Sequence, residues 1–299
     1  MGASGRLVDV GGYRLHLDCR GEGSPAVILE AAIWDLGLTW ARVQPEAASF
    51  TRVCSYDRAG LGRSDRGSRP RTADAMVEEL HALLGGAGVP PPYVLVAHSF
   101  GALVARLFAH RHPQEVAGMV MVDAAHEDQL RRFPASVRAA WGPISEMQLG
   151  VLRAAREAIG DGTFDPATTP VPDLPSDAAD LYRSLLTDGP GTIDTQIEEH
   201  ERLEESQAIV RQAGITSLGD IPLVVLSHAV PPPAFPPELG VTPEDHERYE
   251  EVWQELQAEL AALSTRGERR IAEGAGHMIH HDRPDLVVEA IRDVVEAAR

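Results

Sequence analysis

Short apolar runs alternate with amphipathic segments along most of the chain. Runs rich in β-branched and aliphatic residues predict strands at residues 7–10, 13–18, 27–30, 52–56, 93–97, 116–122, 223–227 and 269–272. Between most of these runs, apolar positions recur at helical spacing, at residues 40–48, 72–84, 102–109 and 285–298. Strands that alternate with helices in this way predict a mostly parallel, eight-stranded sheet with helices on both faces.

Two stretches interrupt the alternation. Residues 125–220 have a helical pattern broken by proline and glycine, and this stretch is too long for a connection. We interpret it as a helical cap inserted after strand 6, with residues 1–124 and 221–299 forming the core. A second excursion at residues 229–265 begins with a proline-rich run and continues into an amphipathic helix at 243–263.

A serine stands where the fifth predicted strand passes into a helix. Residues 93–101 read Tyr-Val-Leu-Val-Ala-His-Ser-Phe-Gly, so Ser99 has small residues two positions before and after it, Ala97 and Gly101. A tight strand-to-helix turn needs small residues there, and it lifts the serine hydroxyl clear of the sheet. The sequence therefore predicts Ser99 as a nucleophile. His98 adjoins it, but the turn directs that side chain to the opposite side, where it packs or forms a pocket wall.

A serine nucleophile needs a base and a group that orients the base. His277 lies on the glycine-rich loop Glu273-Gly-Ala-Gly-His277, after a predicted strand. Asp123 ends the apolar run at 116–122 and supplies the acid in the chain order Ser, Asp, His. Another location for the acid stays open. It would follow the seventh strand, where the first carboxylates are Glu238, Glu244 and Asp245.

These motifs together resemble the α/β-hydrolase superfamily, in particular its cap-bearing bacterial branch with a serine nucleophile. The resemblance rests on residues 27–33, the turn Tyr56-Asp-Arg-Ala-Gly-Leu-Gly-Arg-Ser64, the elbow at 97–101 and the histidine loop with Asp282-Arg-Pro284. It implies the α/β-hydrolase fold. It also implies an oxyanion hole made by the backbone N–H groups of Phe100 and Ile33, since the chain has no asparagine amide to offer.

The resemblance also guides the expected surroundings of the site. We place the substrate pocket among six side chains: Trp34, His98, Phe133, Trp141, Met147 and Met278. Trp34 and Phe100 could equally fill the core. His280 and His281 are expected at the rim or surface. Asp57, Arg58 and Ser64 are expected to secure the fourth-strand turn by local hydrogen bonds.

Composition restricts the partners and the compartment. The formal net charge of −18 argues against nucleic acid or an anionic membrane as a partner. No apolar run is long enough for a membrane span, and no export segment is recognisable, so we expect a cytoplasmic protein. Cys19 and Cys54 are then expected to be reduced, although the family's strand order would make them neighbours. No cofactor or metal is expected, because His110 and His112 diverge on a helix.

The predicted function is that of a serine hydrolase, an esterase or lactonase, cleaving a carboxylic ester or lactone of a small, largely apolar compound through an acyl-enzyme. Two alternatives stay open. One is an acyltransferase, cyclase or thioesterase of natural-product metabolism that uses the same triad. The other is a non-catalytic ligand-binding protein. The oligomeric state is left open.

Overall fold

The sheet has eight strands in the order β1-β2-β4-β3-β5-β6-β7-β8. The computed structural model describes residues 5–168, 171–188 and 191–299. β1 and β4 both pair antiparallel with β2, and every other pairing is parallel, which confirms the predicted fold class. The strands are β1 (Arg6–Asp9), β2 (Arg14–Arg20), β3 (Ala26–Glu30), β4 (Val53–Tyr56), β5 (Tyr93–His98), β6 (Val116–Val122), β7 (Leu223–His228) and β8 (Gly267–Ala272).

The alternation of side chains along each strand builds two core layers. Along β5, Leu95 packs with α2 (Ala73–Ala87) and α3 (Gly101–Arg111) on one face. Its neighbours Val94 and Val96 pack with α1 (Gln44–Ala47) and α11 (Pro284–Ala297) on the other. Successive side chains of a strand point to opposite faces, so a wholly apolar strand is the pattern expected of a sheet covered on both sides.

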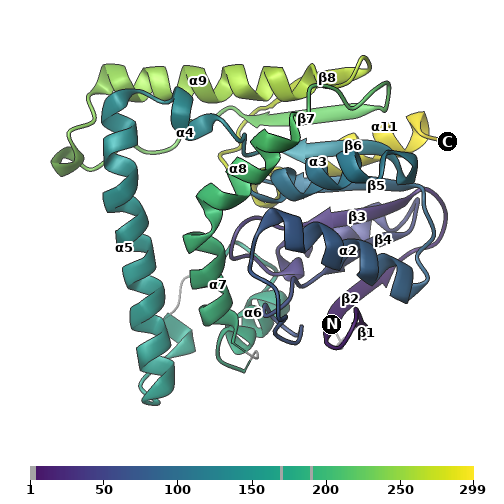
Figure 1. Ribbon diagram of the computed structural model, residues 1–299, viewed down its shortest axis with the longest axis horizontal. Helices are drawn as coiled ribbons and strands as arrows, with labels where there is room; N and C mark the ends of the chain where they lie inside the picture. Colours follow the sequence, from purple (N-terminus) through teal and green to yellow (C-terminus); the bar gives the residue numbers. More distant parts are fainter. Residues whose placement is uncertain (1–4, 169–170, 189–190) are drawn as a thin grey trace.

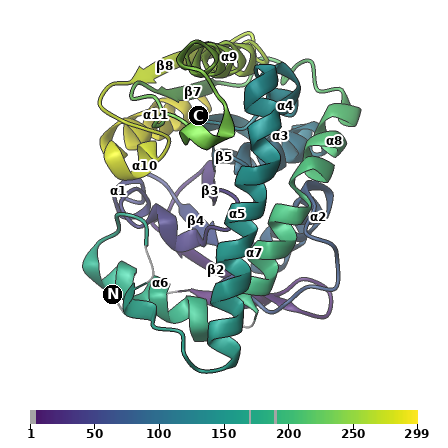
Figure 2. The same ribbon diagram turned by 90° about the vertical axis from the view of Figure 1, so that its left-hand side faces the viewer.

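Helices between β6 and β7 cover one end of the sheet. These are α4 (Gln129–Arg132), α5 (Ala135–Gly160), α6 (Ser176–Asp188), α7 (Thr192–Glu201) and α8 (Leu203–Ala213). Figure 1 shows the long α5 standing beyond the ends of the strands, and Figure 2 shows it crossing in front of them with α7 alongside. The upper end of α5 meets α9 (Pro243–Ala261), the helix of the second excursion. The strand ends and these helices enclose the candidate site.

Small departures from the predicted elements occur near the chain turns. The helix expected at 40–48 is divided into a 3-10 turn, η1 (Gly37–Trp40), and the short α1. A further short helix, α10 (Ile279–Asp282), follows the histidine loop. No helix in the described ranges combines the length and apolar character that a membrane crossing requires.

Cys19 and Cys54 form a disulfide, so the expectation of two reduced thiols is wrong. The two residues are directly opposed on the antiparallel strands β2 and β4. Directly opposed residues of an antiparallel pair have adjacent side chains, which is the arrangement a cross-strand disulfide needs. The compartmental reasoning failed here because it took no account of strand register.

Candidate active site

Ser99 lies in the strained turn between β5 and α3. Its φ of 50° is in the left-handed region, which residues other than glycine rarely adopt. Gly101 permits the turn, because a Cβ there would lie 2.6 Å from the backbone oxygen of Ala31. Val122 accepts a hydrogen bond from the Ser99 N–H at 3.1 Å, which fixes the turn against the end of β6. The backbone thus holds the hydroxyl at the carboxyl edge of the sheet.

The structure brings Ser99, His277 and Asp123 together, with His277 in contact with the other two residues. His277 Nε2 lies 3.1 Å from Ser99 Oγ, and His277 Nδ1 lies 2.5 Å from Asp123 Oδ2. Asp123 follows β6 directly, is fully buried and also has a positive φ, of 42°. A base within hydrogen-bond reach of a nucleophile, oriented by a buried carboxylate, is the geometry of a nucleophilic triad.

The three alternative acids lie elsewhere. Glu238 and Glu244 are exposed, on η4 (Pro237–Leu239) and in the first turn of α9. Asp245, half-buried, accepts a hydrogen bond from Ser136 at 2.5 Å. Asp123 is the carboxylate within hydrogen-bond distance of His277 among the described residues.

Asp123 also contacts a second histidine, which the sequence analysis did not single out. His228 Nδ1 lies 2.9 Å from both carboxylate oxygens of Asp123, and Trp253 Nε1 donates to Oδ1 at 3.0 Å. Burial alone would raise the pKa of Asp123, but the hydrogen bonds from His228 and His277 outweigh it and lower that pKa well below its usual range. The sequence did contain a signal for this contact: His228 ends β7, and β7 lies beside β6, the strand that Asp123 follows.

Two residues that line the cavity, Phe100 and Ile33, have backbone N–H groups without an acceptor among the described residues. Among the described residues, none accepts a hydrogen bond from the N–H of Phe100, which precedes α3, or from that of Ile33, which follows β3. Free N–H groups on either side of a nucleophile can stabilise an oxyanion. These are the two donors that the sequence analysis expects.

A buried ion-pair network connects the loop after β3 to the cap. Arg58 bonds Glu199 of α7 through Nε at 2.7 Å and Nη2 at 2.9 Å, and Glu30 through Nη1 at 2.8 Å. The same Glu199 accepts the Trp34 N–H at 2.9 Å. The expectation of a purely local role is therefore wrong for Arg58, because its partner is distant in sequence. Asp57 and Ser64 do make local bonds, to Arg63 N and to Asp57 O respectively.

A cavity of about 810 Å³ lies between Ser99 and the cap. Four of the six predicted pocket residues line it, namely Trp34, His98, Trp141 and Met278. Its volume lies within the range of small-molecule sites. Apolar side chains from the core and the cap form much of its wall, among them Phe100, Leu152, Leu203, Val230 and the prolines at 231–233.

Two predicted pocket residues, Phe133 and Met147, lie outside this cavity. Phe133 is 1% exposed and packs in a separate apolar cluster with Val137 and Trp253, at the junction of α5 and α9. Met147 is 61% exposed, on the solvent face of α5. Residue type alone suggested both. Phe133 lies in the extended bend between α4 and α5, which directs it into that cluster, whereas the position of Met147 on the helical wheel of α5 turns it toward solvent.

The histidines that follow the triad histidine are buried, contrary to the expectation of rim or surface positions. His280 and His281 both lie 3.0 Å from Thr39 Oγ1 through Nε2, because the short α10 folds them back onto η1. His98 is fully buried and its Nε2 hydrogen-bonds the backbone oxygen of His277 at 2.9 Å. His98 therefore supports the loop that presents His277.

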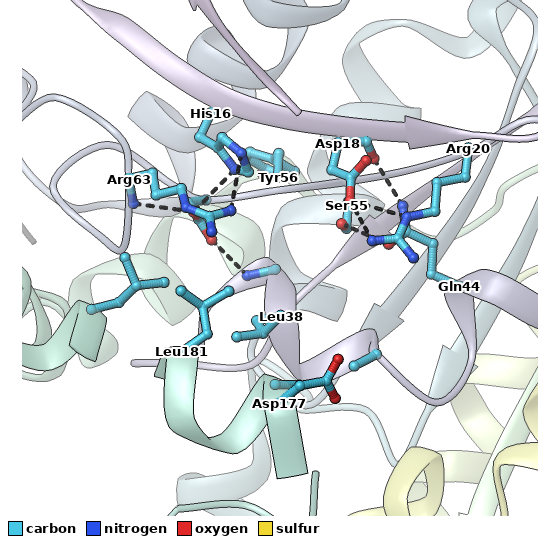
Figure 3. A pocket seen from close by; sticks show the side chains of 15 residues that line it. His16, Asp18, Arg20, Leu38, Gln44, Ser55, Tyr56, Arg63, Asp177 and Leu181 are labelled. Atoms are coloured by element: carbon cyan, nitrogen blue, oxygen red, sulfur yellow. Dashed lines mark hydrogen bonds and ion pairs between the residues drawn. The ribbon is translucent and has the colours of Figure 1, made fainter. Parts of the chain in front are cut away.

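A second cavity, under α6, has a volume of only about 60 Å³ (Figure 3). His16, Tyr56 and Arg63 line one part of it, while Leu181 of α6 closes it from the cap side. This volume accommodates a few water molecules but no organic substrate. The cavity at Ser99 is the candidate substrate site, because Ser99, Asp123 and His277 line it.

One group of potential metal ligands occurs among the described residues, formed by His81, His112 and Glu115. The rings of His81 and His112 stack at 4.0 Å with an interplanar angle of 13°. Nearly parallel stacked rings do not direct both nitrogen lone pairs at one point, so we assign this group no metal role.

The chain belongs to the α/β hydrolase family, whose sequence model matches residues 15–290. A Bacillus subtilis relative, the uncharacterized protein YqjL, is 28% identical over 97% of this chain and 91% of its own length. The lipase LipV of Mycobacterium tuberculosis is 36% identical, over 37% of this chain and 42% of its own.

Solved structures agree on the fold. The epoxide hydrolase CorEH matches with a TM-score of 0.70 at 16% identity, covering 99% of both chains. A mutant epoxide hydrolase of Vigna radiata matches with a TM-score of 0.70 at 17% identity, covering 98% of both. At these identities the similarity concerns the fold alone.

Proposed function

We propose that the protein is a serine hydrolase that cleaves a carboxylic ester or lactone through an acyl-enzyme. The observation that carries the proposal is the contact of Ser99 Oγ with His277 Nε2 at 3.1 Å, with Asp123 at 2.5 Å behind the imidazole. Similarity to a protein named as a lipase supports it over part of the chain.

The proposed reaction has two halves, and His277 acts in both. His277 takes the Ser99 proton as Oγ attacks the carbonyl carbon, and the N–H groups of Phe100 and Ile33 hold the oxygen that becomes negative. His277 then gives that proton to the departing alkoxide as the acyl bond breaks. Water, deprotonated by the same imidazole, attacks the acyl-enzyme and releases the acid and free Ser99.

Serine at the elbow favours a carbonyl substrate over an epoxide, although the two neighbours named above are epoxide hydrolases. Attack of a serine hydroxyl on an epoxide would leave an alkyl ether on the protein. An ether has no carbonyl for a water molecule to attack, so turnover would stop after one event. An acyl ester of Ser99 is instead hydrolysed by the same base.

Solvent access favours hydrolysis over acyl transfer. The side chain of His277 is 44% exposed, so water can reach the base beside the acyl-enzyme. The cavity of about 810 Å³, with its largely aliphatic and aromatic wall, supports an apolar substrate of moderate size.

Hydrolysis of p-nitrophenyl esters of increasing chain length tests the proposal. Ser99→Ala should abolish turnover, while Ser49→Ala, at an exposed serine, should leave it unchanged. Added alcohols at millimolar concentration should leave most product as free acid. Dominant transfer to one alcohol would instead support the acyltransferase, and a folded wild type without turnover on any ester would support a ligand-binding protein.

A further inference from the structure

His228, the last residue of β7, lies between two carboxylates. Its Nδ1 is 2.9 Å from both oxygens of Asp123, and its Nε2 is 2.7 Å from Glu250 Oε1 on α9. An ionised carboxylate only accepts hydrogen bonds, so both ring nitrogens must donate. A histidine that donates from both nitrogens is an imidazolium.

The charged and titratable groups around His228 come from four elements. Asp123 follows β6, Glu250 and Tyr249 belong to α9, Arg269 lies on β8, and His277 is on the loop beyond it. Burial alone would lower the pKa of His228, but its hydrogen bonds to the two carboxylates raise it to about 9. Burial also raises the pKa of Tyr249, so this phenol stays neutral.

Arg269 is hydrogen-bonded to two neutral side chains. Its Nε donates to Ser227 Oγ at 2.8 Å, and its Nη2 donates to the Gln254 side-chain oxygen. It makes no ion pair with Asp123 or Glu250 among the described residues. The imidazolium of His228 is therefore the cation in direct contact with the triad acid.

We propose that His228 is a positioning residue, a resident imidazolium that fixes the Asp123 carboxylate and shares its charge, so that the pH dependence of catalysis at Ser99 changes when His228 loses that charge. The proposal rests on the proposed function, because it concerns the base that serves Ser99. His228 reaches the reaction only through Asp123.

Two physical effects follow from the position of His228. Its backbone and ring N–H groups, with Trp253 Nε1, leave Asp123 little freedom to rotate away from His277. Its positive charge on the other side of Asp123 also makes a second positive charge, on His277, less favourable. Glu250 partly offsets that charge, since it lies on the side of His228 away from Asp123.

Removing the positive charge of His228 and removing the negative charge of Glu250 should therefore move the pH profile of the reaction at Ser99 in opposite directions. His228→Gln removes a positive charge and should move the acid limb of the pH profile up by about one pH unit. Glu250→Gln removes a negative charge farther from His277 and should move the same limb down by about 0.3 units. Glu251→Gln, on the exposed side of α9, is the matched control and should move nothing.

The readout is the second-order rate constant for labelling of Ser99 by a fluorophosphonate, measured from pH 5 to 9. This reaction needs no knowledge of the natural substrate. Circular dichroism and thermal melts identify variants that fail to fold, and Glu250→Gln, at a half-buried position, provides a second variant if His228→Gln does. In wild type and Glu250→Gln, NMR of ¹⁵N-histidine should also show His228 protonated at pH 7.

The outcomes separate the two proposals. The inference is supported if the acid limb moves up in His228→Gln and down in Glu250→Gln, and if His228 is protonated at pH 7. Equal losses of rate at every pH, no shift in either folded variant, or a neutral His228 at pH 7 would overturn it while leaving the serine hydrolase intact. Absence of labelling of wild-type Ser99 would count against the proposed function, and the NMR titration would still report the charge of His228.

Discussion

Glu199→Gln should separate the cap's structural role from its effect on catalysis. Glu199 of α7 is fully buried and joins Arg58 to the Trp34 N–H in the loop after β3. Trp34 has a φ of 69°, a conformation that costs about 1 kcal/mol or more for a residue other than glycine and needs support from its surroundings. Replacing the carboxylate by an amide removes one of the acceptors and the charge that balances Arg58.

The variant should lose both stability and kcat. Breaking a buried ion pair costs about 3 to 5 kcal/mol, but Glu30 still pairs with Arg58 and the amide keeps one acceptor, so we expect about 3 kcal/mol of unfolding free energy. The N–H of Ile33, next to Trp34, would also lose its fixed direction. Complete loss of one oxyanion donor lowers kcat by about 10² to 10³. Gln196 still donates a hydrogen bond to the Trp34 carbonyl at 2.8 Å, so we expect a smaller decrease in kcat, of about 10- to 100-fold.

The assay compares urea unfolding with kcat and KM on a p-nitrophenyl ester. The decrease should fall on kcat, because the oxyanion develops only in the transition state. Glu201→Gln, an exposed glutamate on the same helix that pairs with Arg153, is the control and should change neither quantity appreciably. A stability loss of the expected size with kcat within threefold of wild type would refute the link between cap and oxyanion loop.

Three further results are expected. Asp123→Asn should keep the fold and lower kcat by about 10³ to 10⁴, while Glu244→Gln stays within about tenfold; the reverse order in kcat would move the acid to α9. Protonated His228 should stabilise the fold by up to about 3 kcal/mol; this contribution is complete below about pH 6.5 and is lost as pH rises through about 9. The unfolding free energy of His228→Gln, measured in urea, should therefore change less with pH over this window than that of the wild type. Equal changes with pH in the two proteins would show that His228 is not charged. Reducing Cys19–Cys54, separated by 35 residues, should lower the unfolding free energy by about 4 kcal/mol, and two free thiols in unreduced, denatured protein would contradict the bond.

The strands and their order follow closely from the sequence, because burial on both faces leaves a local signal. β5 and β6 are almost wholly apolar, and the turn at Ser99 is encoded by small residues within three positions of it. Motif order then indicated which strand ends would meet. For this reason Ser99, His277 and Asp123, far apart in sequence, could be proposed as neighbours before the structure.

Contacts between the cap and the core could not be predicted in this way. The partner of Arg58 is Glu199, separated by 141 residues, and nothing in the local pattern of either residue identifies the other. Helix faces caused similar errors, since Met147 has the composition of a pocket residue but faces solvent. The disulfide depended on the register of β2 against β4, whereas the expected compartment indicated free thiols.

Intact-mass spectrometry after fluorophosphonate treatment tests the central claim most directly. The probe reacts only where a serine is activated by a base beside an oxyanion hole. The account predicts one adduct per chain, mapped to Ser99, absent in Ser99→Ala and strongly slowed in His277→Ala. Folded wild-type protein that remains unmodified, or an adduct that persists in Ser99→Ala, would contradict it.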